Sequence, residues 1–159
     1  MIAFCPLCSS DEYTSLDTDP DGKQFAQCSN AKEHGADGYA WIPSSPSGSE
    51  RGTRSDGLGI ELGVWDKLLE CVPTDGEFHS YGEVEDTFFA LYPREASTLQ
   101  NRYGHRWREG AKSDGTYSMS VYLALRLSEL RREGVLEATW LPAEGEWAYN
   151  GVISHWRVR

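Results

Sequence analysis

The hydrophobic positions between residues 60 and 133 recur with the period of an α-helix, at spacings of three and four residues. This period predicts helices over Ile60–Cys71, over Tyr81–Tyr92, from Ser97 or Thr98 to about Glu109, and over Ser118–Glu133. Proline lacks a backbone N–H, so Pro73 and Pro93 end the first two helices. Ser80 is expected to cap the second helix, with Glu83 at the capping-box position.

The helix over Ser118–Glu133 has the clearest buried stripe, and Gly134 is a natural residue to end it. Its apolar positions are Val121, Ala124, Leu125, Leu127 and Leu130, continued by Leu136. The period then changes from 3.6 to 2, which is typical of a strand. A terminal β-hairpin is therefore expected, with strand-like segments at Leu136–Trp140, Trp147–Tyr149 and Val152–Val158.

The first 43 residues show short strand patterns, over Glu12–Leu16, Lys23–Gln27 and Gly38–Ile42. The segment 44–59 reads SSPSGSERGTRSDGLG, which offers little apolar surface to offset the entropy of ordering the chain. We therefore predict three parts: a small β module over 1–43, a flexible linker over 44–59 and a mainly helical module over 60–159. The predicted fold class is α+β.

The formal net charge of −10 argues against indiscriminate binding to nucleic acid. The charge is unevenly spread, because residues 1–97 contain six Lys/Arg and eighteen Asp/Glu, whereas residues 98–159 contain nine Lys/Arg and seven Asp/Glu. No apolar run reaches the length of a membrane span, and the N-terminus lacks the pattern of a secretion signal. We expect a cytoplasmic protein, in which four cysteines are better suited to metal binding than to disulfides.

Cysteine spacing gives the most specific chemical signal in the chain. Cys5-Pro6-Leu7-Cys8 is a CxxC knuckle, and Cys28 follows twenty residues after Cys8. Five residues then separate Cys28 from His34. Zinc prefers four nitrogen or sulfur ligands in a tetrahedron. We therefore predict one structural zinc ion per chain, bound by Cys5, Cys8, Cys28 and His34. Cys71 stands alone in an apolar helical pattern and is expected to be a buried thiol.

The order strand, knuckle, hairpin, knuckle, strand resembles the zinc-ribbon fold group. The resemblance covers about a quarter of the chain and rests on the four predicted ligands and the aromatic residues Phe4, Phe25, Tyr39 and Trp41. His34 departs from the commonest pattern of this group, which has four cysteines.

Residues 60–159, with helices followed by a terminal β-hairpin, resemble a winged helix–turn–helix. The resemblance implies that the last helix enters the major groove of double-stranded DNA and that the hairpin touches the backbone. On that helix the candidate contacts are Ser118, Ser120, Tyr122 and Arg126. A second candidate is the basic stretch with Arg102, Arg106, Arg108 and Lys112, because arginine suits bidentate contacts with phosphate. Both segments are equally compatible with ordinary solvated or packing helices.

The sequence therefore favours a zinc-containing, DNA-binding regulatory protein. The alternative is an acidic adaptor or inhibitor that binds a protein partner instead, through the acidic N-terminal region or through Trp140, Trp147 and Trp156. We expect no enzymatic activity, because the chain contains no phosphate-binding glycine loop, nucleophile elbow or HExxH motif.

Overall fold

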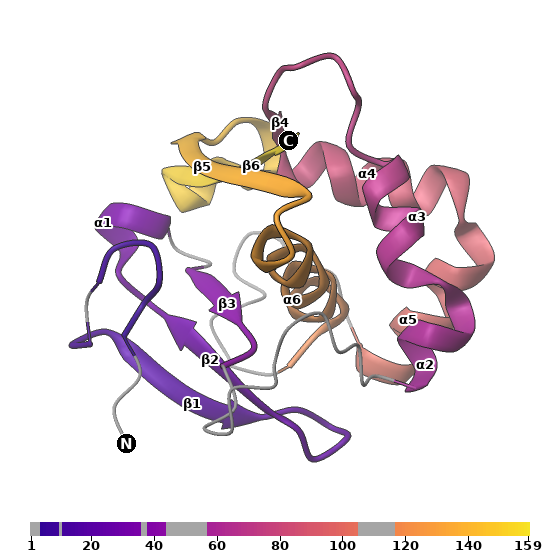
Figure 1. The fold of residues 1–159 in the computed structure, drawn as a ribbon, viewed down its shortest axis with the longest axis horizontal. Helices are drawn as coiled ribbons and strands as arrows, with labels where there is room; N and C mark the ends of the chain where they lie inside the picture. Colours follow the sequence, from indigo (N-terminus) through magenta and orange to yellow (C-terminus); the bar gives the residue numbers. More distant parts are fainter. Residues whose placement is uncertain (1–3, 10, 36–37, 44–56, 105–116) are drawn as a thin grey trace.

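The structure is a computed structural model, and it describes residues 4–9, 11–35, 38–43, 57–104 and 117–159. Within these ranges the chain forms helices and two three-stranded antiparallel sheets, which confirms the predicted mixture of α and β structure (Figure 1). The first sheet contains β1 (Thr14–Thr18), β2 (Gln24–Cys28) and β3 (Tyr39–Trp41) in that order. A single-turn helix, α1 (Ala31–His34), lies between β2 and β3 in the sequence.

The turn between β1 and β2 forms around the side chain of Asp19. One carboxylate oxygen of Asp19 accepts hydrogen bonds from the backbone N–H groups of Asp21 and Lys23, both at 2.9 Å. Gly22 follows with a φ of 84°, a backbone conformation that favours glycine. These contacts fix the register in which Thr18 lies opposite Gln24 and Thr14 opposite Cys28.

The helix predicted over Ile60–Cys71 is divided into two. Helix α2 (Gly57–Leu62) ends at Gly63, which has a φ of 67°, and α3 (Val64–Glu70) begins immediately afterwards. A left-handed residue cannot continue an α-helix, so Gly63 interrupts the pattern although the apolar spacing continues through it. The predicted linker also ended too late, because residues 57–59 already belong to α2. Residues 44–56 lie outside the described part of the chain.

Helices α4 (Tyr81–Leu91) and α5 (Pro93–Tyr103) are separated only by Tyr92. Ser80 caps α4 as predicted, since its hydroxyl oxygen accepts a hydrogen bond from the Glu83 N–H at 3.2 Å. Pro93 ends α4 and also begins α5, where a proline in the first turn is tolerated because that N–H needs no partner. The predicted start of this helix at Ser97 or Thr98 was therefore one turn late.

The second sheet has the strand order β4 (His79–Ser80), β6 (Val152–Val158) and β5 (Leu136–Pro142). Strands β5 and β6 form the predicted hairpin, with Ala138 opposite Trp156. Strand β4 was not predicted, because two residues carry no recognisable period. The segment Gly145–Asn150 is a 3₁₀ helix, η2, so the prediction of a strand at Trp147–Tyr149 was wrong.

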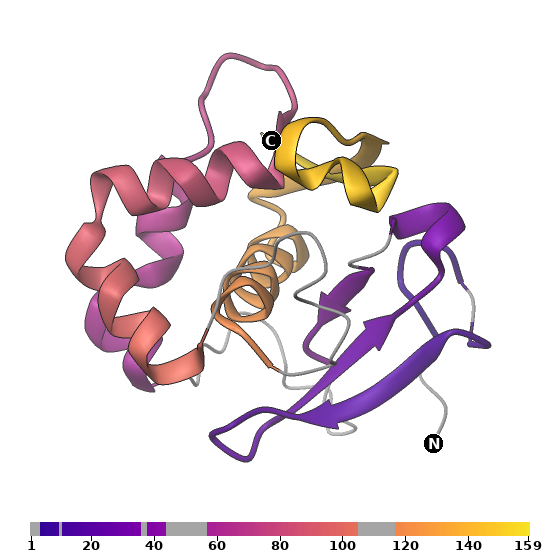
Figure 2. The ribbon, with the colours of Figure 1, turned by 180° about the vertical axis from the view of Figure 1, so that it is seen from behind.

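Helix α6 (Met119–Arg132) lies at the centre of the fold, with the first sheet on one side and the other long helices on the opposite side (Figures 1 and 2). Leu123, Leu127 and Leu130 belong to the core that α6 shares with helices α3–α5 and the second sheet. Val121 and Leu125 instead pack against Phe25 and Ala40 of the first sheet. The described parts of the two predicted modules are therefore in direct contact through α6.

Candidate metal centre

The first half of the candidate metal centre is the knuckle Cys5–Cys8. The Ser9 N–H donates a 2.9 Å hydrogen bond to the Cys5 carbonyl oxygen, and Ser9 has a φ of 63°. This tight turn brings Cys5 and Cys8 to the same side of the backbone. The backbone N–H groups of Cys8 and Leu7 also point at the Cys5 sulfur, where they stabilise negative charge.

The second half comes from the end of β2 and the short helix α1. Cys28 is the last residue of β2, and His34 is the last residue of α1. The His34 N–H donates a 2.9 Å hydrogen bond to the Asn30 carbonyl oxygen, which closes the helical turn. Residue 38, where the chain returns toward β3, must be glycine, because a Cβ there would lie 2.5 Å from the Cys28 carbonyl oxygen.

The four predicted ligand atoms converge. The Sγ atoms of Cys5, Cys8 and Cys28 and one ring nitrogen of His34 all lie within 4.8 Å of one another. The Cys8 and Cys28 sulfurs are 3.8 Å apart, and the Cys5 sulfur is 3.4 Å from Nε2 of His34. Tetrahedral zinc with Zn–S bonds of about 2.3 Å and Zn–N bonds of about 2.0 Å requires separations of about 3.8 and 3.5 Å for such pairs. The donor set can therefore hold one metal ion.

Burial controls the protonation of these side chains. It raises the pKa of the Cys5 thiol, raises that of Cys28 to about 12, and lowers that of the His34 imidazole. Without a cation the site therefore favours neutral thiols and a neutral imidazole. A neutral imidazole is already able to coordinate, whereas each thiol must release its proton to a metal.

The surroundings of His34 are aromatic. Its ring centroid lies 4.7 Å from that of Trp140 and 5.8 Å from that of Tyr39. Among the described residues, Nδ1 of His34 is buried and has no hydrogen-bond partner. The nitrogen close to the cysteines is Nε2, and among the described residues the ring is positioned by its packing against Trp140 and Tyr39.

The candidate DNA contacts on the last helix are not on an accessible face. Ser118, Ser120, Tyr122 and Arg126 are all buried. Ser118 caps α6, and the Ser120 hydroxyl donates a 2.7 Å hydrogen bond to Glu85. These four candidate contacts are therefore packing positions in the structure, because the first sheet and helices α3–α5 cover α6 on both sides.

Two of these buried side chains form part of an internal network. The Tyr122 ring stacks on that of Tyr103, with centroids 4.6 Å apart. The Arg126 guanidinium lies over the Tyr122 and Trp65 rings and forms a 2.6 Å ion pair with Glu129. Arg126 is thus a core residue in this structure.

The basic stretch is described only in part. Arg102 is exposed near the end of α5, where it forms an ion pair with Asp21 of the β1–β2 turn. Arg106, Arg108 and Lys112 lie outside the described residues. The tryptophans predicted to form an apolar patch for a protein partner do not do so, because Trp147 and Trp156 are buried in the main core. Trp140 is half-buried beside the metal centre.

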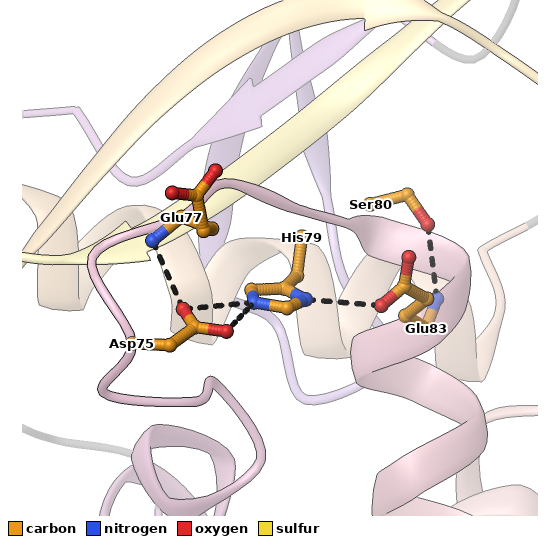
Figure 3. Close-up of polar contacts among 5 residues, drawn as sticks. All are labelled: Asp75, Glu77, His79, Ser80 and Glu83. Carbon is orange, nitrogen blue, oxygen red and sulfur yellow. Dashed lines mark hydrogen bonds and ion pairs between the residues drawn. The ribbon is translucent and has the colours of Figure 1, made fainter.

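A second polar cluster surrounds His79 and was not predicted. Its Nδ1 is 3.0 Å from a carboxylate oxygen of Glu83, and its Nε2 is 3.0 Å from Asp75, on the opposite side of the ring (Figure 3). These two carboxylates raise the pKa of His79, with the hydrogen bond to Glu83 as the largest cause. The carboxylates do not converge on one point, so this cluster does not have the geometry of a metal site.

Comparison with known proteins gives no information about the function of this protein. No protein-family model, no curated protein and no solved structure matches this chain. Within the described residues, none of the helices is both long and apolar enough to cross a membrane.

Proposed function

We propose that Cys5, Cys8, Cys28 and His34 hold one zinc ion and that its role is structural. The observation that carries this proposal is the convergence of the four donor atoms within 4.8 Å, with the Cys8–Cys28 and Cys5–His34 pairs at the separations that a tetrahedral ion requires. Three sulfurs and one imidazole suit zinc better than magnesium or calcium, which prefer oxygen ligands. All four positions of a tetrahedron are filled by protein, so no open position remains for a water or substrate.

Metal analysis of the purified chain, prepared under reducing conditions, tests the zinc proposal. We expect one zinc per chain, and a strong chelator should lower the melting temperature. Cys8→Ser should lose the metal. Cys71→Ser should keep it, because Cys71 is buried in the main core that α6 shares with helices α3–α5, away from the metal centre. A wild-type chain that contains no zinc, and that is not stabilised by added zinc, would overturn the proposal.

We propose further that the protein is a DNA-binding regulator, and that α5 rather than α6 faces the nucleic acid. Support comes from the side chains that α5 exposes: Arg94, Ser97, Thr98, Asn101 and Arg102. They lie at spacings of three and four residues and so share one face. The opposite face is buried through Ala96, Leu99 and Tyr103. Hydrogen-bonding side chains between two arginines are suited to contacts with phosphates and base edges.

The charge on α5 also favours an anionic partner. Its one acidic residue, Glu95, is paired with Lys67 at 3.2 Å. The exposed face of α5 therefore carries two arginines and no carboxylate of its own, although Arg102 is paired with Asp21 of the β1–β2 turn and only Arg94 adds uncompensated positive charge in a chain whose net charge is −10. Local attraction of this kind can act despite the acidic remainder, since exposed charges are screened beyond about 8 Å at physiological salt.

Binding to a pool of random duplexes, measured from low to moderate salt, tests the DNA proposal. Affinity should fall steeply with salt, by about one log–log slope unit for each phosphate neutralised. Arg94→Ala should reduce both the affinity and this slope, whereas Lys32→Ala, an exposed lysine on α1, should change neither. If the full chain shows no salt-sensitive binding, DNA binding is excluded and the acidic adaptor becomes the leading hypothesis.

A further inference from the structure

The metal centre contacts a part of the chain that is distant in sequence. Three of its four predicted ligands belong to the first knuckle and β2, but the fourth, His34, packs against Trp140 of β5. Trp140 also packs edge-on against Tyr39 of β3, with ring centroids 5.5 Å apart. Both views of the fold show α1 beside the C-terminal hairpin (Figures 1 and 2).

The backbone makes a second contact at the same place. Gly35, which directly follows His34, has a φ of 76°. A Cβ at this position would lie 1.9 Å from the carbonyl oxygen of Val152 and 2.9 Å from that of Asn150. The backbone therefore approaches the start of β6 more closely than any residue with a side chain would allow. This contact and the Trp140 ring hold the end of α1 against the hairpin.

From these contacts we infer that the C-terminal hairpin positions His34 for the metal, through Trp140 and the close approach of Gly35 to Val152. Metal binding and attachment of the first sheet to the hairpin are then coupled. The inference rests on the proposed zinc site. Metal-bound histidines are usually oriented by a hydrogen bond to the second ring nitrogen. Within the described residues Nδ1 of His34 has no such partner, and the contacts that the structure gives the ring are with Trp140 and Tyr39.

Glycine substitutions separate this contact from simple backbone strain. Gly35→Ala keeps all four ligands but places a methyl group against the β6 backbone. Gly22→Ala is the matched control, because Gly22 also has a positive φ of 84° but a Cβ there meets no atom within 4 Å. Zinc affinity of the full chain, measured by competition with a chromogenic chelator, should fall at least about tenfold in Gly35→Ala relative to Gly22→Ala.

Substitutions at Trp140 test the same inference without changing the backbone. Trp140→Ala removes the ring beside His34 and should weaken zinc binding by about tenfold. Trp140→Phe keeps an aromatic ring and removes the indole N–H, which is buried without a partner among the described residues. It should therefore bind zinc as well as the wild type. Leu141→Ala is the control for the hairpin, since Leu141 is 40% exposed.

Hydrogen exchange on the full wild-type chain shows the coupling directly. Removing zinc should speed exchange not only in β2 and β3 but also at the start of β6. If the wild type binds zinc but Gly35→Ala and Trp140→Ala bind it equally well, the inference is wrong and the zinc site stands. If Gly35→Ala does not fold, the zinc affinities of Trp140→Ala and Trp140→Phe test the inference, and equal affinities would show that it is wrong. A wild type without zinc overturns both the inference and the proposed site.

Discussion

The Tyr103 hydroxyl donates a 2.7 Å hydrogen bond to a carboxylate oxygen of Asp21, which fastens the β1–β2 turn to the last turn of α5. The other carboxylate oxygen of Asp21 pairs with Arg102. The hydrogen bond from Tyr103, followed by the contact with Arg102, lowers the pKa of Asp21. The acidic tip of the first sheet therefore neutralises one of the two arginines on the exposed face of α5.

Asp21→Asn should release Arg102 from this ion pair. If α5 binds DNA as proposed, the variant should bind duplex more tightly, and the salt dependence should steepen by about one slope unit. Asp17→Asn is the control, because it removes an equal charge from the same hairpin. Asp17 contacts Gln27 within this hairpin, whereas Arg102 pairs with Asp21. Equal effects of the two substitutions on DNA affinity would show that net charge matters, rather than the contact with Arg102.

The position of α6 predicts large effects of truncation in its buried stripe. Leu127 and Leu130 are 0% and 1% exposed and belong to the main core. Replacing either with alanine should lower the free energy of unfolding by about 2–5 kcal/mol, through lost burial and the cavity left behind. Chemical denaturation measures this, with Leu141→Ala as the exposed control. A loss below about 1 kcal/mol at Leu127 would contradict the central position of α6.

The sequence was sufficient to predict those parts of the structure whose pattern lies within one segment of the chain. Alternating and helical periods predicted α4, α6 and the β5–β6 hairpin, and cysteine spacing predicted the four residues that converge in the metal centre. The periods depend on residues close together in the chain, and the ligands are recognised by residue type and spacing within the single stretch of residues 5–34.

Contacts between distant residues could not be predicted in this way. Ser120 and Arg126 read as polar surface positions, but Glu85 and Glu129 satisfy them inside the fold. Similarly, Ser128 donates a 2.6 Å hydrogen bond to the Ala40 carbonyl oxygen, across eighty-eight residues. A polar residue on a helix reads as exposed unless its partner is known, and the partner is set by tertiary structure.

The two carboxylates around His79 predict a pH dependence of stability. A neutral imidazole has one N–H, so donating to both Asp75 and Glu83 requires the protonated ring. The folded pKa is raised above the ordinary value of about 6.5. The resulting stabilisation is complete below about pH 6.5 and is lost as the pH rises through the folded pKa.

Melting temperatures of the wild type and of His79→Gln, measured from pH 5.5 to 8.5, test this prediction. The wild type should be more stable than the variant at the acidic end, and the difference should shrink toward the alkaline end. Asp75→Asn should reduce the same pH dependence while leaving the histidine in place. A difference between wild type and His79→Gln that does not change with pH would show that the folded protein does not raise the pKa of His79.

Substitution of Arg126 distinguishes two roles for this residue, a DNA contact on the surface and an ion-pair partner in the core. Its side chain is 6% exposed, and its partner Glu129 also accepts a 3.0 Å hydrogen bond from the Trp65 indole N–H. Arg126→Ala leaves the Glu129 carboxylate without its cation in a mostly buried position. We expect the free energy of unfolding to fall by about 3–5 kcal/mol. The double variant Arg126→Met/Glu129→Gln should recover much of this loss, because it removes both charges together. If Arg126→Ala instead folds as stably as the wild type and changes only DNA affinity, then α6 is accessible in solution and the assignment of the DNA-facing surface to α5 is wrong.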